Sequence, residues 1–214
     1  AWSGQIQSAV SFDLSHCEDP AGFLIESLTL SPALWSGAMP FSDGRSHRAE
    51  MMKLPYMATW HGVSHDHGSG RIVLGEDGEA LVRWSLADPV DRRVAARAHV
   101  EVARMHHAAG AREISTFHFT PRRWRTGEDF DAYLDQLRET PPEDYTAYTA
   151  HQMSSCRMGA DPEASVADGR GQLHLVPGAW VGDASALPTA PGVNPMITLM
   201  ALAELTAQHM LSDA

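Results

Sequence analysis

Residues 71–109 read RIVLGEDGEALVRWSLADPVDRRVAARAHVEVARMHHAA, and two different periodicities meet in this stretch. Its first part has two short apolar runs, 71–74 and 80–84, on either side of Gly75-Glu76-Asp77-Gly78. Glycine readily adopts the positive φ angles that tight turns need, so this part predicts an antiparallel β-hairpin.

The second part of the stretch has the spacing of a helix. Apolar residues recur at steps of three and four, at Val94, Ala98, Val102, Met105 and Ala109. Asp88-Pro89 precedes this pattern and Gly110 follows it, which are typical start and stop signals. We therefore expect one long helix between them.

Segments on both sides of this stretch resemble further strands. The candidates that mix apolar and polar residues between turn signals are Ile6–Leu14, Phe23–Leu30 and Tyr56–Val63. Glu113–Phe119 is expected to return to the same sheet, and residues 122–142 hold at most one short helix, around Phe130–Leu137. Together they predict an α+β fold class, an antiparallel β-sheet covered by helices.

Composition excludes several classes of function. The 214 residues are 43% hydrophobic and 20% charged, as in ordinary globular proteins. Sixteen Lys and Arg against 27 Asp and Glu give a net charge of −11, which repels a phosphate backbone, so no nucleic-acid partner is expected. The densest basic cluster, residues 122–125, is short, and we interpret it as a solvated turn. No apolar run approaches the roughly 20 residues of a membrane span.

Two segments near the end of the chain concentrate chemically useful residues. Residues 151–159 read HQMSSCRMG, and residues 180–189 read WVGDASALPT, followed by GVNPMIT at 192–198. The apolar run 178–181 predicts a strand that stops at Asp183 and small residues, where a ligand can approach the backbone. An ordinary turn is the alternative.

The end of the second segment has the pattern of a helix start. Asn194 is a favourable cap, Pro195 suits the first helical position, and an apolar face continues to about Leu211. The free N–H groups and partial positive charge at such a start favour an anion or an electron-rich carbonyl. This segment alone leaves open that Asn194 only caps the helix.

The order and spacing of these motifs resemble the C-terminal region of the glucose-methanol-choline (GMC) oxidoreductase family. The motifs are the H-x-x-x-x-C-x-M-G segment from His151, Val166-Ala167-Asp168, residues 181–185 with Pro188, and Asn194-Pro195 at the last helix. The resemblance is strong from Ala150 onward and looser before it.

This resemblance implies an FAD-dependent enzyme that oxidises an alcohol. Residues 1–150 would be the substrate-binding domain. Residues 151–214 would be the active-site segment with a strand and a helix that complete a Rossmann-like FAD-binding domain. In the family the first His serves as the base for the substrate hydroxyl, a role that falls on His151, and its partner at the last helix would be Asn194.

The same resemblance suggests cofactor contacts. Asp183 and Ala184 would touch FAD through the main chain, and Asn194, Pro195 and Met196 would lie beside the flavin ring. The chemistry is reasonable, because hydride transfer to flavin N5 becomes easier as the hydroxyl proton leaves, and a His is suited to accept that proton. Asn194 can hydrogen-bond the same oxygen.

Two features depart from the family pattern. Ser154-Ser155 stands where many members have Gly-Thr, and Ser154 adds bulk where Gly permits close approach. The chain also lacks a strand followed by G-x-G-x-x-G and a helix, so no pyrophosphate cradle is present. We therefore expect the chain to be the C-terminal part of such an enzyme, with an N-terminal FAD-binding polypeptide as its partner and a small-molecule alcohol as its substrate.

Other chemistries fit the sequence less well. Its twelve histidines include His65 and His67 and the pair His106-His107, but their spacing matches no common metal motif, so no metal is expected. Ser185 lacks G-x-S-x-G, and Cys156 lies in the GMC-like segment, so covalent hydrolysis is not expected. A non-catalytic β-rich binding or scaffold module derived from such an enzyme stays open as the alternative.

Overall fold

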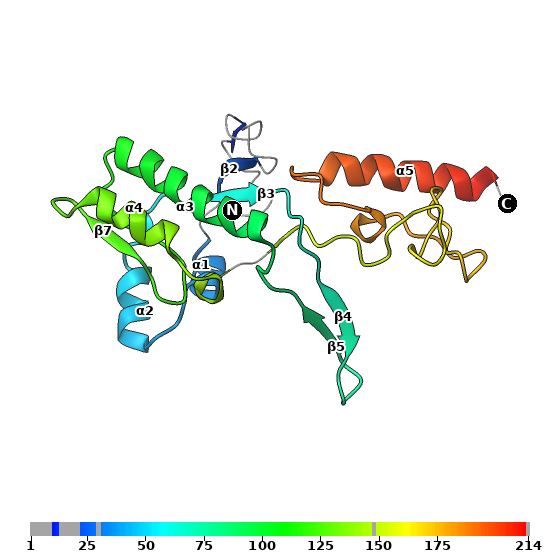
Figure 1. Ribbon diagram of the computed structural model, residues 1–214, viewed down its shortest axis with the longest axis horizontal. Coiled ribbons are helices and arrows are strands. Elements are labelled where there is room, and N and C mark those ends of the chain that lie inside the picture. Colours follow the sequence, from blue (N-terminus) through cyan, green and yellow to red (C-terminus); the bar gives the residue numbers. More distant parts are fainter. Residues whose placement is uncertain (1–9, 13–21, 29–30, 147–148, 213–214) are drawn as a thin grey trace. The chain divides into compact units, whose positions relative to one another are not determined.

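The computed structural model describes residues 10–12, 22–28, 31–146 and 149–212 (Figure 1). The chain divides into two units, the first made of residues 1–64 and 86–147 and the second of residues 65–85 and 148–214. Parts of the expected strands Ile6–Leu14 and Phe23–Leu30 fall outside the described residues.

The first unit contains a three-stranded antiparallel sheet against the long predicted helix. The strands are β1 (Val10–Ser11), β2 (Phe23–Ser27) and β3 (Trp60–Ser64), in that order, and the helix is α3 (Pro89–Ala108). Its core consists of Phe23, Ile25, Val94 and Ala98. At Gly62 the backbone of β3 approaches α3 so closely that an added Cβ would lie 2.7 Å from the Ala98 Cβ.

A second core forms on the same helix. It contains Val100, Ala103, Ile114, Trp124, Tyr133, Leu134 and Leu137. The elements around it are β6 (Glu113–Ser115), β7 (Arg123–Arg125) and α4 (Phe130–Arg138). The expectation of a solvated turn at residues 122–125 was wrong, because Trp124 is only 5% exposed and anchors this core. The strand after α3 also pairs with β7 and not with the main sheet.

Short helices complete the first unit. They are α1 (Pro32–Ala38), α2 (Gly44–Met51), and the 3-10 helices η1 (Leu54–Tyr56) and η2 (Pro142–Asp144). The side chains of Ser31 and Asp43 cap α1 and α2. Ser and Asp before a helix are a sequence signal for its start, and an interpretation of this region based on strands overlooks that signal. Tyr56 therefore ends a 3-10 helix, and β3 begins only at Trp60.

In the described residues of the second unit, the main regular elements are one hairpin and one α-helix. The predicted hairpin is confirmed as β4 (Arg71–Leu74) and β5 (Ala80–Arg83). The terminal helix α5 (Met196–Ser212) begins one residue after the predicted Pro195. Residues 178–181 form no strand and contribute a single bridge, Gln172 to Trp180.

The expected mixture of helices and antiparallel sheet is thus present. The strands, however, form three small sheets among the described residues and not one continuous sheet. None of the described helices is both long enough and apolar enough to cross a membrane.

Candidate active site

The His151 segment (residues 151–159) runs alongside the Asp183 segment (residues 180–189). The amides of Ser154, Cys156 and Met158 donate to the carbonyls of Ala184, Ser185 and Ala186 at 3.2, 2.9 and 2.8 Å respectively. The two motifs that the sequence analysis singled out, nearly thirty residues apart, therefore meet through their main chains.

Asp183 holds the short helix of the second segment. It caps the 3-10 helix η3 (Ala184–Ala186), and its Oδ1 accepts the Ser185 amide at 2.8 Å and the Ser185 hydroxyl at 2.5 Å. These hydrogen bonds from the Ser185 side chain and backbone lower the pKa of the Asp183 carboxyl. Because the carboxylate is engaged with Ser185, it fixes the main-chain path beside Ala184.

Ser154 has an unusual backbone conformation. Its φ angle is +69°, and it is the sole non-glycine with positive φ in the part of the chain that the structure describes. This conformation favours glycine because a Cβ crowds the following carbonyl. Ser154 stands where many members of the family have glycine, and its backbone takes the conformation that glycine prefers.

The opening of α5 exposes its first residues. Pro195 is buried, and the first bond of the helix runs from the Leu199 amide to the Pro195 carbonyl at 2.8 Å. Met196 is 62% exposed and Ile197 69% exposed. The first-turn amides of an α-helix have no partner within the helix, so this start offers N–H donors next to Asn194.

His65 is a neighbour of this region that sequence reasoning missed. A Cβ added to Gly192 would lie 3.2 Å from the Cβ of His65 and within 3.6 Å of its ring. Gly192 itself has a φ angle of +70° and belongs to the loop that enters α5. The only sequence signal was the His65-Asp66-His67 run, which was weighed only as a metal motif and set aside, and nothing in it indicates a contact with a distant loop.

His151 is half-buried, and its amide donates to the Thr149 hydroxyl at 2.9 Å. Asn194 is exposed. The approach of these two side chains to each other, and the roles of Asp183, Ala184, Pro195 and Met196 toward a cofactor, stay predictions.

A separate buried polar cluster lies in the first unit. The rings of His99, His118 and Tyr145 lie together, with centroids 4.6 Å apart for the two histidines and 4.7 Å for His118 and Tyr145. Burial, with smaller effects from His99 and Arg122, lowers the pKa of His118 to about 3. Burial also raises the pKa of Tyr145 to about 12. No group of three or more His, Cys, Asp or Glu side chains that could hold a metal ion occurs among the described residues.

Comparison with known proteins identifies the family. The model of the GMC oxidoreductase C-terminal domain matches residues 66–203, more than half of the chain. This chain belongs to the GMC oxidoreductase family, as the motifs around His151 and Asn194 indicated.

Individual relatives match along most of the chain. Long-chain-alcohol oxidase FAO4A of Arabidopsis thaliana is 31% identical over 186 residues, which are 84% of this chain and 25% of that protein. The uncharacterized GMC-type oxidoreductase Rv0492c of Mycobacterium tuberculosis (strain ATCC 25618 / H37Rv) is 31% identical over 218 residues, 99% of this chain and 32% of that protein. The chain thus spans about a quarter to a third of the length of these relatives.

A solved structure supports the fold. Pyridoxine 4-oxidase from Mesorbium loti is similar with a TM-score of 0.52 and 17% sequence identity, over 87% of this chain and 34% of that one.

Proposed function

We propose that this chain is the C-terminal part, as a subunit or a fragment, of an FAD-dependent oxidoreductase that acts on CH–OH groups. In this proposal residues 1–150 are the substrate-binding domain, and residues 151–214 are the active-site segment with the elements that complete a Rossmann-like FAD-binding domain. The observation that carries the proposal is the set of three hydrogen bonds that aligns residues 154–158 with residues 184–186, just before α5.

The residues present suit one edge of a flavin. The reduced ring gains negative charge near N1 and the C2 carbonyl, and an exposed helix start supplies N–H donors and positive potential. Such donors occur at the start of α5, where Met196 and Ile197 are exposed. Pro195 and Asn194 would lie beside this edge, while Asp183 and Ala184 would contact the cofactor through their main chain. The pyrophosphate would be held by the N-terminal polypeptide, because this chain has no glycine-rich phosphate loop.

His151 and Asn194 would act on the substrate. His151 is proposed to accept the hydroxyl proton, and Asn194 to hydrogen-bond the same oxygen. When bound, the flavin supplies the hydride acceptor. The chain's own contribution is therefore to orient the alcohol and to take its proton.

Helix α5 supports a role as part of a larger domain. Residues 196–212 read MITLMALAELTAQHMLS, yet only Thr206 is buried. A helix that is apolar on nearly all sides is normally found inside a protein. The N-terminal FAD-binding polypeptide is the partner that we propose to cover it.

An alcohol is the proposed substrate, in keeping with relatives named long-chain-alcohol oxidases. Anaerobic addition of primary aliphatic alcohols to the complete enzyme should bleach the oxidised-flavin absorbance. A complete protein that contains flavin but is bleached by no alcohol in a chain-length series would contradict this substrate class. A protein that contains no flavin would favour the scaffold alternative.

A further inference from the structure

The β4–β5 hairpin exposes side chains that a sheet normally buries. Cross-strand partners share a face of an antiparallel pair, and the register places Ile72 opposite Val82 and Leu74 opposite Ala80. Ile72 is 57% exposed, Leu74 79% and Val82 75%. One complete face of the hairpin, which we call the apolar face (Ile72, Leu74, Ala80 and Val82), is open to solvent.

The other face combines apolar and positive groups. Val73 lies opposite Leu81, and Arg71 lies opposite Arg83. Like charges directly opposite each other destabilise a strand pair. The hairpin's own carboxylates, at residues 76, 77 and 79, belong to the turn at the other end. A carboxylate from elsewhere would therefore be favourable beside Arg71 and Arg83.

The hairpin has few means of stabilising itself. Figure 1 shows β4 and β5 as a narrow ribbon, and in the described part of the chain these two strands form a sheet of their own. An isolated two-stranded hairpin is marginally stable in water, and exposed apolar surface of this kind marks an interaction site. Both observations indicate that another surface covers the hairpin.

We propose that the β4–β5 hairpin is a docking element that the N-terminal polypeptide of the same enzyme covers. The apolar face packs against an apolar surface of that polypeptide, which brings a carboxylate to Arg71 and Arg83. This inference rests on the proposed function. Its support is the charge pattern of the hairpin and the length of the relatives, of which this chain spans 25%, 32% and 36%.

Cysteine labelling tests the proposal directly. Val82→Cys and Glu76→Cys place a thiol on the apolar face and in the turn of the same hairpin. In the complete enzyme a water-soluble maleimide should modify position 82 at least tenfold more slowly than position 76. Ala80→Cys is a second probe of the apolar face in case Val82→Cys fails to fold. Wild-type enzyme gives the background from Cys17 and Cys156.

Three outcomes would overturn the inference. In the complete enzyme, labelling of position 82, or of position 80 in its place, at the same rate as position 76 would show that the apolar face is open to solvent. Slow labelling at position 82 already in the 214-residue chain would show that this chain covers its own hairpin. Protection that appears only as the complete enzyme dimerises would assign the face to a second copy.

The flavin spectrum of the same samples separates this inference from the proposed function. A protected thiol in a complete protein without flavin supports docking and contradicts the flavoenzyme assignment. A reactive thiol in a flavin-loaded enzyme contradicts docking alone.

Discussion

The amide of Ser154 donates a hydrogen bond to the carbonyl of Ala184 at 3.2 Å, while Ser154 holds a φ angle of +69°. This bond is the first of the three that align the His151 segment with the Asp183 segment. The left-handed conformation of Ser154 is therefore the bend that directs the chain from His151 into that alignment.

Ser154→Gly should stabilise the protein. Glycine removes the crowding of a Cβ at positive φ, which costs about 1 kcal/mol for other residues, and it keeps the amide that bonds to Ala184. We expect the free energy of unfolding to rise by up to about 1 kcal/mol in urea titrations, because the greater freedom of glycine in the unfolded chain offsets part of the gain. Ser155→Gly is the matched control and should lower stability. Equal losses in the two variants would show that Ser154 is not strained.

Stability should fall in mild acid because of the buried histidine pair. Burial lowers the pKa of both His99 and His118, so the unfolded chain binds protons near pH 6.5 while the folded chain does not. This contribution to stability is complete above pH 6.5 and is lost as the pH falls toward the folded pKa. For His118, with a pKa of about 3, the loss at pH 5 is about 2 kcal/mol.

The variant His118→Phe tests whether His118 causes this loss of stability in mild acid. The groups facing His118 include His99 on α3, Arg122, and Asp144 and Tyr145 near η2. Urea unfolding at pH 7 and pH 5 should show a smaller difference in the variant than in the wild type, whatever its absolute stability. An unchanged pH dependence would exclude His118 as its source.

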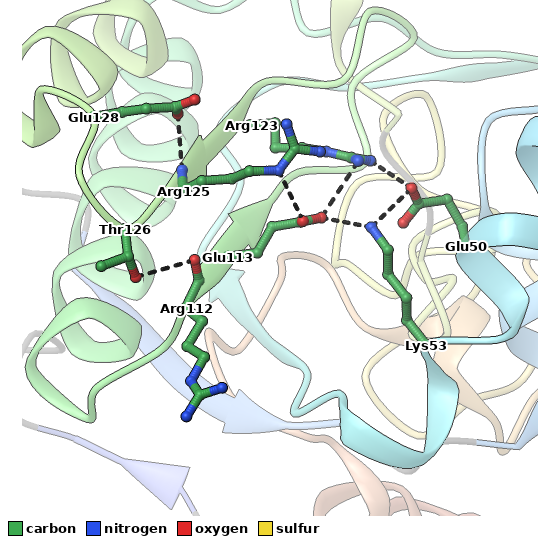
Figure 2. A network of polar contacts seen from close by, with 8 residues as sticks. All are labelled: Glu50, Lys53, Arg112, Glu113, Arg123, Arg125, Thr126 and Glu128. Carbon is green, nitrogen blue, oxygen red and sulfur yellow. Dashed lines mark hydrogen bonds and ion pairs between the residues drawn. The ribbon is translucent and has the colours of Figure 1, made fainter.

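A charged network around Glu113 of β6 connects the β6–β7 sheet to Glu50 of α2 and to Lys53, which follows that helix (Figure 2). Its carboxylate lies 2.6 Å from the Lys53 Nζ, 3.3 Å from Arg123 and 3.1 Å from Arg125, and Glu50 binds Lys53 and Arg123 from the other side. Burial raises the pKa of Glu113, but the hydrogen bonds from Lys53 and Arg125 and the neighbouring cations outweigh it, so the pKa is lowered.

Glu113→Ala should destabilise the protein by about 1 kcal/mol, because three cations then lose a shared partner. The control is Asp135→Ala, which removes a single exposed ion pair with Arg138 and should cost less than about 0.5 kcal/mol. Part of the network is solvent-exposed, so high salt should reduce the difference between the stability losses of the two variants. A difference in stability loss that does not change with salt would show that Glu113 acts through packing.

Sequence patterns predicted the elements whose signals are local. The glycine-flanked hairpin, the three- and four-residue spacing of α3 and the Asn-Pro start of α5 each lie within a few residues. The pairing of β6 with β7 was missed because Trp124 lies between arginines, and its burial depends on α4 and α3 rather than on its neighbours in sequence.

The candidate site was predictable as motifs and not as geometry. The order of His151, Asp183 and Asn194 indicated the family, but no local pattern indicates that residues 154–158 bond to residues 184–186. The proximity of His65 to Gly192 could not be predicted from the sequence either, because the two positions are more than a hundred residues apart.

The rate of flavin reduction in His151→Ala tests the central claim most directly. In the complete enzyme, mixed anaerobically with alcohol in a stopped-flow instrument, the variant should reduce its flavin roughly 10²- to 10⁴-fold more slowly than the wild type, the usual contribution of a general base. Asn194→Ala should lose less, and both variants should retain flavin. A His151→Ala enzyme that holds flavin and is reduced at the wild-type rate would contradict the account.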